Sequence, residues 1–213
     1  MSSDVLVTTP AQRQTEPHAE AVSRNRRQQA TFRKVLAAAM ATLREKSYAA
    51  LTVRLVAARA KVAPATAYTY FSSKNHLIAE VYLDLVRQVP CVTDVNVPMP
   101  IRVTSSLRHL ALVVADEPEI GAACTAALLD GGADPAVRAV RDRIGAEIHR
   151  RITSAIGPGA DPGTVFALEM AFFGALVQAG SGTFTYHEIA DRLGYVVGLI
   201  LAGANEPSTG GSE

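Results

Sequence analysis

The sequence has few of the residues that build disulfide, metal or catalytic sites. It contains only 2 cysteines, Cys91 and Cys124, and their spacing matches no metal motif. A disulfide framework and a zinc site are therefore disfavoured, and free thiols suit a reducing compartment such as the cytoplasm. The sequence also shows no phosphate-binding glycine loop, no metal cluster and no nucleophile beside a base. We expect no cofactor, and an enzyme is the least favoured class of protein.

Long apolar runs are missing as well. The N-terminus has no stretch like a signal peptide, and no segment reaches membrane-spanning length without polar interruption. Hydrophobic residues nevertheless make up 48% of 213 residues, enough for a sizeable core in one domain or two small ones. We therefore expect a soluble, cytoplasmic protein without membrane contacts.

Charge is distributed unevenly along the chain. Residues 23–87 hold 12 Lys or Arg against 3 Asp or Glu, and the rest of the chain holds 9 against 17, out of totals of 21 and 20. A basic N-terminal region on an acidic body favours contact with a polyanion. A solvated helix surface is the alternative interpretation of the same charges.

Residues 50–77 have the pattern of two short helices joined by a tight turn and followed by a third helix. Thr52 stands where an N-cap belongs, just ahead of apolar residues at helical spacing. Pro64 suits the first turn of the second helix, and Ser72 or Ser73 opens the third. Two helices of about two turns, joined by about three or four residues, form a helix-turn-helix, which puts its second helix into the DNA major groove.

This stretch resembles the DNA-binding unit of TetR-family transcriptional repressors. The matching residues, all at the family's spacing, are Thr52, Val53, Val56, Ala57, Ala60, Val62, Thr66, Tyr68, Tyr70, Phe71, Ser73, Lys74 and Leu77. Lys61 and Ala63 depart from the family, which usually has Gly and Ser there. Losing the Ser removes a cap from the second helix, at a cost of about 1 kcal/mol. In having Lys61 and Ala63 at these two positions, the sequence resembles KstR-like regulators of sterol catabolism.

Four residues outside the second helix are candidate contacts to the DNA backbone. Thr52 and Arg54 can reach phosphate through the hydroxyl, the helix N-terminus and the guanidinium. Arg27 can reach a phosphate or the adjacent minor groove, or it can lie in a solvated tail. For Lys74, the resemblance implies a phosphate contact.

The second helix carries the candidate contacts to bases. Its methyl groups can touch thymine methyls and its Thr hydroxyls can bond base edges. Tyr68 and Tyr70 offer a hydroxyl to phosphate, or they are packed rings with a hydroxyl in solvent. No residue of this helix has obvious bidentate reach to a base, so specificity leans on apolar contacts and DNA shape. The remaining candidates on the helix are Pro64, Ala65, Thr66 and Thr69.

The periodicity predicts an all-α chain of about nine helices. We expect a disordered arm over residues 1–22, a helix-turn-helix domain over 23–73, a ligand-binding and dimerisation domain over 74–204, and a disordered tail over 205–213. Helices outside the motif are expected over about residues 25–46, 74–89, 119–129, 162–179 and 186–202, with two more near 103–114 and 134–156.

The helix over residues 162–179 is apolar on most sides and must therefore be buried on most sides. Its own core can cover one side, and the other needs a partner or further core. The resemblance implies that the last two helices pair with their copies in a homodimer, which would read a palindromic operator. The expected interface residues are Leu168, Phe172, Ala175, Leu176, Ala179, Ile189, Leu193, Val196, Val197 and Ile200.

The resemblance also implies a ligand cavity in the C-terminal body. Its expected lining is Leu110, Val114, Leu128, Phe166, Met170 and Phe173, although ordinary core packing would use the same residues. Such a lining suits a lipid, a sterol-like molecule or an acyl-CoA. The sequence thus predicts a homodimeric repressor released from its operator by an apolar ligand. A DNA-binding regulator without a small-molecule ligand is the alternative, and a small helical enzyme is the remote one.

Overall fold

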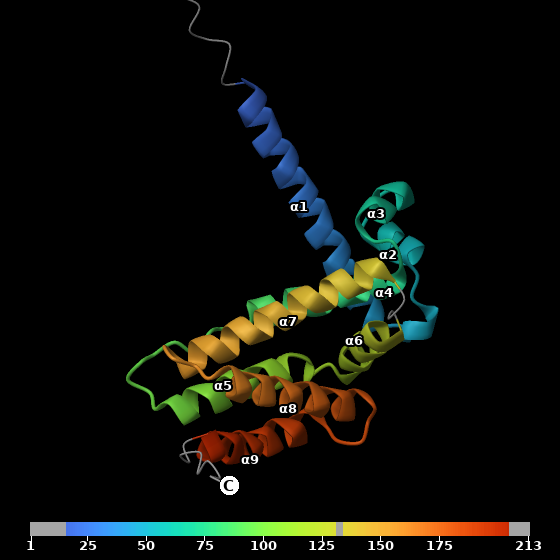
Figure 1. The fold of residues 1–213 in the computed structure, drawn as a ribbon. Helices are drawn as coiled ribbons and strands as arrows, with labels where there is room; N and C mark the ends of the chain where they lie inside the picture. Colours follow the sequence, from blue (N-terminus) through green and yellow to red (C-terminus); the bar gives the residue numbers. More distant parts are fainter. Residues whose placement is uncertain (1–15, 131–133, 205–213) are drawn as a thin grey trace, which may run out of the picture.

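Residues 16–130 and 134–204 are described in the computed structural model, and within these ranges the protein has nine α-helices and no strand. Figure 1 shows a small N-terminal group of helices above a larger layered body. The predicted all-α fold, with a helix-turn-helix domain ahead of a helical C-terminal domain, is confirmed.

The N-terminal head consists of α1 (Glu16–Leu43), a 3-10 turn (Tyr48–Ala50), α2 (Val53–Arg59) and α3 (Pro64–Tyr70). Phe71 is fully buried at its centre, and the ring of Phe32 from α1 stacks on it at a centroid distance of 5.1 Å. This aromatic pair fixes the end of α3 against α1, and so sets the orientation of the second helix of the motif.

The N-terminal arm differs from the prediction. α1 begins at Glu16, so residues 16–22 of the expected disordered arm are helical. Residues 1–15 of that arm, and the expected disordered tail over 205–213, lie outside the described residues.

The turn between α2 and α3 contains the two departures from the family pattern. Lys61 has φ = 53°, in the left-handed region that favours glycine. Ala63 is the N-cap of α3 and provides no side-chain hydrogen bond to the helix. By contrast, Thr52 caps α2 and Ser73 caps α4, each accepting a backbone N–H bond as predicted.

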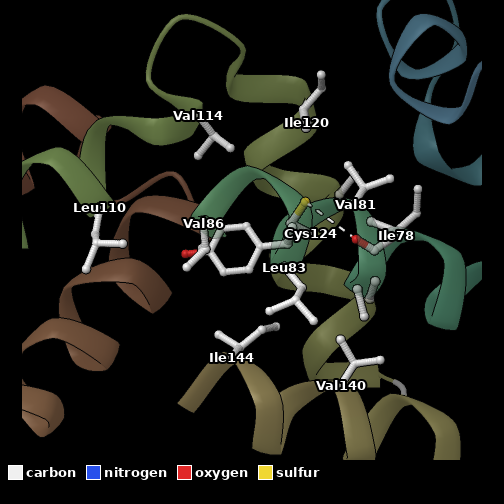
Figure 2. Packing of buried hydrophobic residues seen from close by; sticks show 14 of the residues in the cluster. Ile78, Val81, Leu83, Val86, Leu110, Val114, Ile120, Cys124, Val140 and Ile144 are labelled. Atoms are coloured by element: carbon white, nitrogen blue, oxygen red, sulfur yellow. Dashed lines mark hydrogen bonds between the residues drawn. The ribbon is translucent and has the colours of Figure 1, made fainter. Parts of the chain in front are cut away.

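α4 (Lys74–Gln88) connects the head to the body and is buried along most of its length. Every residue from Leu77 to Leu83 is buried, as is Val86. Figure 2 shows side chains of α4 packed among those of α5, α6 and α7, with the Cys124 thiol pointing to the Ile78 carbonyl at 4.0 Å. The helix is therefore the central element of the body as well as its link to the head.

The body is completed by five further helices. α5 packs along α9, α8 pairs with α9, and α4 lies against α6 and α7 (Figure 1). Asp134 and Asp161 cap α7 and α8 by accepting backbone N–H bonds. The bounds are Met99–Ala111 for α5, Pro118–Asp130 for α6, Pro135–Ile156 for α7, Pro162–Gly180 for α8 and Tyr186–Ala204 for α9, with a 3-10 turn at Leu112–Val114 after α5.

α8 is long and apolar enough to cross a membrane by length and composition alone. Core helices of soluble proteins pass the same test, but only 22% of this window is buried inside the fold. The helix therefore leaves much apolar surface uncovered in a single chain.

Candidate nucleic-acid interface and body cavity

α3 presents a face of small and polar residues to solvent, and Ala67 on its opposite side is buried in the head. The Thr69 hydroxyl donates to the Thr66 carbonyl at 2.7 Å, which leaves its oxygen lone pairs open to a donor. All five candidates on this helix other than Tyr70 are exposed, namely Pro64, Ala65, Thr66, Tyr68 and Thr69. The backbone of α3 can therefore approach another molecule closely along this face.

The start of α2 carries a cation outside any ion pair of the described residues. Thr52 Oγ1 accepts the Leu55 N–H at 3.1 Å, and Arg54 beside it is exposed. Arg59, the other arginine of α2, is held by Glu45 in a two-pronged ion pair with both contacts at 2.6 Å. Of the two arginines, Arg54 is therefore the one able to meet a phosphate.

Tyr70 and Lys74 are half-buried, and packing fixes the direction of both side chains. The Tyr70 ring lies edge-on to Phe32 at a centroid distance of 6.1 Å. The Lys74 ammonium lies 4.3 Å from the centre of the Tyr48 ring and donates to the Tyr48 carbonyl at 3.4 Å. Contacts within the head therefore fix the direction of the Tyr70 hydroxyl and of the Lys74 ammonium.

Arg27 lies on a helix and not on a tail. α1 projects away from the other helices in Figure 1, and residues 25–30 on it are exposed. The helix α1 therefore holds Arg27 beyond the packed part of the head.

A cavity of about 360 Å³ lies in the body between α4, α6, α7, α8 and α9. Apolar side chains dominate its wall, which is the usual character of small-molecule sites. Its lining residues are Tyr82, Gly121, Cys124, Thr125, Leu128, Leu129, Arg141, Ile144, Phe173, Leu176, Val177 and Tyr186.

Only two of the six residues predicted to line a ligand cavity line this one. Leu128 and Phe173 line this cavity, whereas Leu110 and Val114 are buried in the core beside it. Phe166 and Met170 are 61% and 52% exposed, so they lie on the outer surface of α8. The sequence could not orient α8, because a helix that is apolar all round has no pattern to mark its inner face.

Hydroxyl and thiol groups on the wall provide the cavity's polar character. Burial raises the pKa values of Tyr82 and Tyr186 above the ordinary tyrosine value, and it raises the pKa of the Cys124 thiol to about 12. All three stay protonated near neutral pH. Tyr82 Oη is buried and has no hydrogen-bond partner among the described residues. Neither tyrosine was predicted from the sequence, since nothing in their helical spacing separates a cavity wall from core.

Arg141 is the charged residue of the lining. Its Nη1 donates to the Leu128 carbonyl in the last turn of α6, at 3.3 Å. Its neighbours on α7 are neutralised by carboxylates, Arg143 by Glu80 and Arg151 by Glu147. Arg141 forms no such pair with any residue in the described ranges.

Several residues of α8 lie on the opposite side of the helix from the one predicted. Leu168 and Phe172, expected at the dimer interface, are fully buried within the body, and Ala179 is also buried. The same holds for Ile189, Leu193 and Val197 on α9. The outward apolar residues of the two helices are Phe166, Met170, Val177, Tyr195 and Leu199, and the half-buried members of the predicted set are Ala175, Leu176, Val196 and Ile200.

The outer face of α8 and α9 is also hollowed. A groove of about 560 Å³ runs between these helices, with Met170, Gly174, Tyr195 and Val196 among its lining residues. A glycine in the groove lets another backbone approach closely.

The polar contacts that tie the head and α4 to the body include three between side chains. Ser73, the cap of α4, donates through its hydroxyl to Asp134, the cap of α7, at 2.9 Å. Glu80 of α4 is buried and pairs with Arg143 of α7. The third contact joins Arg44 of α1 to Glu117, which precedes α6. Movement of α4 relative to α7 would strain the first two contacts.

The N-terminal region matches a known family. Residues 35–81, which span the end of α1, the helix-turn-helix and the start of α4, match the family model of bacterial regulatory proteins, tetR family. These residues, less than a quarter of the chain, are therefore similar to the tetR family.

Solved structures with the same fold cover nearly the whole chain. A TetR transcriptional regulator from Rhodococcus sp. RHA1 is 21% identical, with a TM-score of 0.69 over 84% of this chain and 98% of that one. FadR from Bacillus subtilis, in complex with stearoyl-CoA, is 14% identical, with a TM-score of 0.54 over 81% and 98%. The multidrug binding protein EbrR, complexed with imidazole, is 18% identical, with a TM-score of 0.58 over 83% and 91%. At these identities the likeness establishes the fold of the chain and no more.

Proposed function

We propose that this protein is a homodimeric, cytoplasmic repressor that binds a palindromic operator and leaves it when an apolar small molecule enters the body cavity. One observation carries the proposal: Tyr82 lines the cavity, and it lies on α4, the helix that begins at the head. A ligand against Tyr82 therefore acts on the element that sets the position of the helix-turn-helix.

The DNA-binding part uses the domain over residues 23–73. The small exposed residues of α3 contact bases, namely Pro64, Ala65, Thr66 and Thr69. The contacts to phosphates come from Arg27, Thr52, Arg54, Tyr68, Tyr70 and Lys74. Support comes from the exposure of α3, the unpaired guanidinium of Arg54 among described residues, and the basic charge of this region. Phosphate contacts supply sequence-independent affinity, and contacts to base edges supply specificity.

The dimer uses the outer face of α8 and α9, in the domain over residues 74–204. Its exposed apolar side chains and groove are surfaces that a second copy can cover. Two heads related by a dyad read half-sites about 34 Å apart on one face of DNA. The half-buried Ala175, Val196 and Ile200 extend this interface, whereas Leu176 lines the body cavity.

Release follows from a difference in ligand affinity between two states of the body. A ligand that binds better when α4 is tilted pulls α4 away from α7, stretching the Ser73–Asp134 and Glu80–Arg143 contacts. The two heads then no longer match the half-site spacing. By thermodynamic linkage, DNA lowers ligand affinity by the same factor.

The classes of effector suggested by the cavity are a lipid, a sterol-like molecule or an acyl-CoA. Two proteins with the same fold have structures with a bound small molecule, namely FadR with stearoyl-CoA and EbrR with imidazole. The resemblance of Lys61 and Ala63 to KstR-like regulators points to the sterol group. The apolar wall of the cavity supports an apolar effector.

Fluorescence anisotropy with a labelled duplex from the protein's own promoter tests the DNA-binding assignment. Tyr70→Phe removes one hydroxyl and keeps the packed ring, and Arg54→Gln removes one exposed charge. Each change should weaken binding about threefold to tenfold, because a hydrogen bond to a charged group contributes about 1 kcal/mol or more.

Arg138→Gln is the matched control for these variants, because Arg138 is an exposed arginine of α7, in the body. It should bind the duplex like wild type. Wild-type affinity in both head variants would contradict the residue assignments.

A further inference from the structure

The volume of the cavity limits the effector. A dry protein cavity of about 150 Å³ accepts one benzene molecule. The body cavity of about 360 Å³ therefore has room for an apolar group of about two or three rings. A complete coenzyme A thioester, with its nucleotide, is far larger than this space.

The lining of the cavity carries a positive charge and no negative one. Arg141 is the charged lining residue, and it has no ion pair among the described residues. Its single bond to the Leu128 carbonyl uses one of five guanidinium N–H donors. The remaining donors form a planar fork that matches a carboxylate, and Arg–carboxylate pairs are among the strongest hydrogen-bonded contacts in proteins.

The other polar groups of the wall are uncharged. Tyr82, Thr125 and Tyr186 carry hydroxyls, Cys124 carries a thiol, and none of them balances the guanidinium. Glu80 and Glu147, which neutralise other arginines of α7, do not line the cavity. An effector that brings its own negative charge would complete the site.

We propose, on the basis of the proposed effector role of this cavity, that the effector is a compact carboxylic acid. Its carboxylate pairs with Arg141, and its apolar body of about two or three rings packs between Leu128, Ile144 and Phe173. Among the lipid, sterol-like and acyl-CoA classes, this selects a free acid with a small ring system or an equally small chain.

Isothermal titration calorimetry on the full chain tests the proposal with two probes of one shape. The first is 2-naphthoic acid, which is anionic at pH 7.5, and the second is 2-naphthamide, which is neutral. Wild type should bind the acid about tenfold to a hundredfold more tightly than the amide, the range expected for charge-assisted hydrogen bonds. Arg141→Gln should abolish that preference.

Two further variants make the result specific. Arg138→Gln removes an exposed charge one turn away on the same helix and should keep the preference for the acid. Arg141→Lys retains the charge without the fork and should keep part of it. Thermal melting of each variant checks that the fold is intact, and loss of the preference in Arg141→Gln alone supports the assignment.

Equal binding of acid and amide by wild type, binding of neither, or an unchanged preference in Arg141→Gln would overturn the inference. Release of the operator by an uncharged or larger molecule would overturn it as well, while leaving the proposed function standing. If instead a cavity-filling Leu128→Trp variant kept the operator affinity of wild type and no small molecule caused release, the proposed function itself would fail.

Discussion

Tyr82 is the residue at which the cavity meets the helix that carries the head, and its hydroxyl is buried without a partner among the described residues. An unsatisfied buried hydroxyl costs about 1–3 kcal/mol. Such a cost is tolerated where it serves a function, and here the residue lines a cavity proposed to hold a ligand.

Tyr82→Phe should therefore leave the free energy of unfolding unchanged or raise it by up to about 1 kcal/mol, because it removes the unsatisfied group and keeps the ring. Urea denaturation followed by circular dichroism measures this. Tyr186→Phe is the matched control and should lower the free energy, since the Tyr186 hydroxyl interacts with Thr125. A loss above about 1 kcal/mol in Tyr82→Phe would reveal a partner for its hydroxyl.

Glu80 should make stability depend on pH. Burial raises its carboxyl pKa, but hydrogen bonds from His76 and Arg143 outweigh burial and hold the pKa below the ordinary value of 4.5. A lowered folded-state pKa means that the stabilisation is complete above pH 4.5 and is lost as pH falls below it.

Denaturation at pH 7 and at pH 4 checks this expectation in wild type and in Glu80→Gln. The variant should be less stable at pH 7 and should lose less stability on acidification. The control is Asp84→Asn on the same helix, because Asp84 accepts a hydrogen bond from Gln88 and forms no ion pair with any residue of the described ranges. Equal losses in wild type and Glu80→Gln would show that Glu80 is not the group responsible.

At the scale of elements, the turn between α2 and α3 is strained by its own sequence. A lysine at positive φ destabilises the fold by about 1–2 kcal/mol compared with a glycine, which adopts this conformation freely. Ala63 cannot form the side-chain hydrogen bond of an N-cap. Lys61→Gly should raise the free energy of unfolding by about 0.5–1 kcal/mol after the entropy of glycine is included. Ala63→Ser should raise it by about 1 kcal/mol.

Ala58→Ser, an exposed change inside α2, serves as the control for both and should slightly destabilise the protein through helix propensity. Thermal unfolding of the three variants measures the effects. A lower melting temperature for Ala63→Ser would mean that the α3 N-terminus does not accept a cap.

The elements were largely predictable from sequence, and their orientation was not. Thr52, Ser73, Asp134 and Asp161 cap helices at the predicted starts, because a capping side chain is a local signal. Phe166 was expected on the inner side of α8 and is exposed, whereas Phe172 is buried, since the two rings are equally hydrophobic and only packing distinguishes them. Only two of the six residues predicted to line the cavity do so, namely Leu128 and Phe173, because an empty space leaves no mark in helical spacing.

At the scale of the whole molecule, the exposed apolar face of α8 and α9 predicts self-association. Met170→Glu puts a charge into the centre of that face and should weaken the dimer at least tenfold. Val95→Glu, at a residue that is 83% exposed in the loop before α5, should leave it unchanged. Sedimentation velocity over a range of concentrations measures both, and equal masses for the two variants would remove this face from the interface.

The central claim is that two copies of this chain bind DNA together. Sedimentation of a labelled duplex from the protein's own promoter tests it, because one measurement reports both binding and stoichiometry. At low ionic strength we expect a complex containing an even number of chains, which dissociates steeply as salt is raised, since phosphate contacts release counterions. A duplex that sediments free, or with a single chain, would contradict the account.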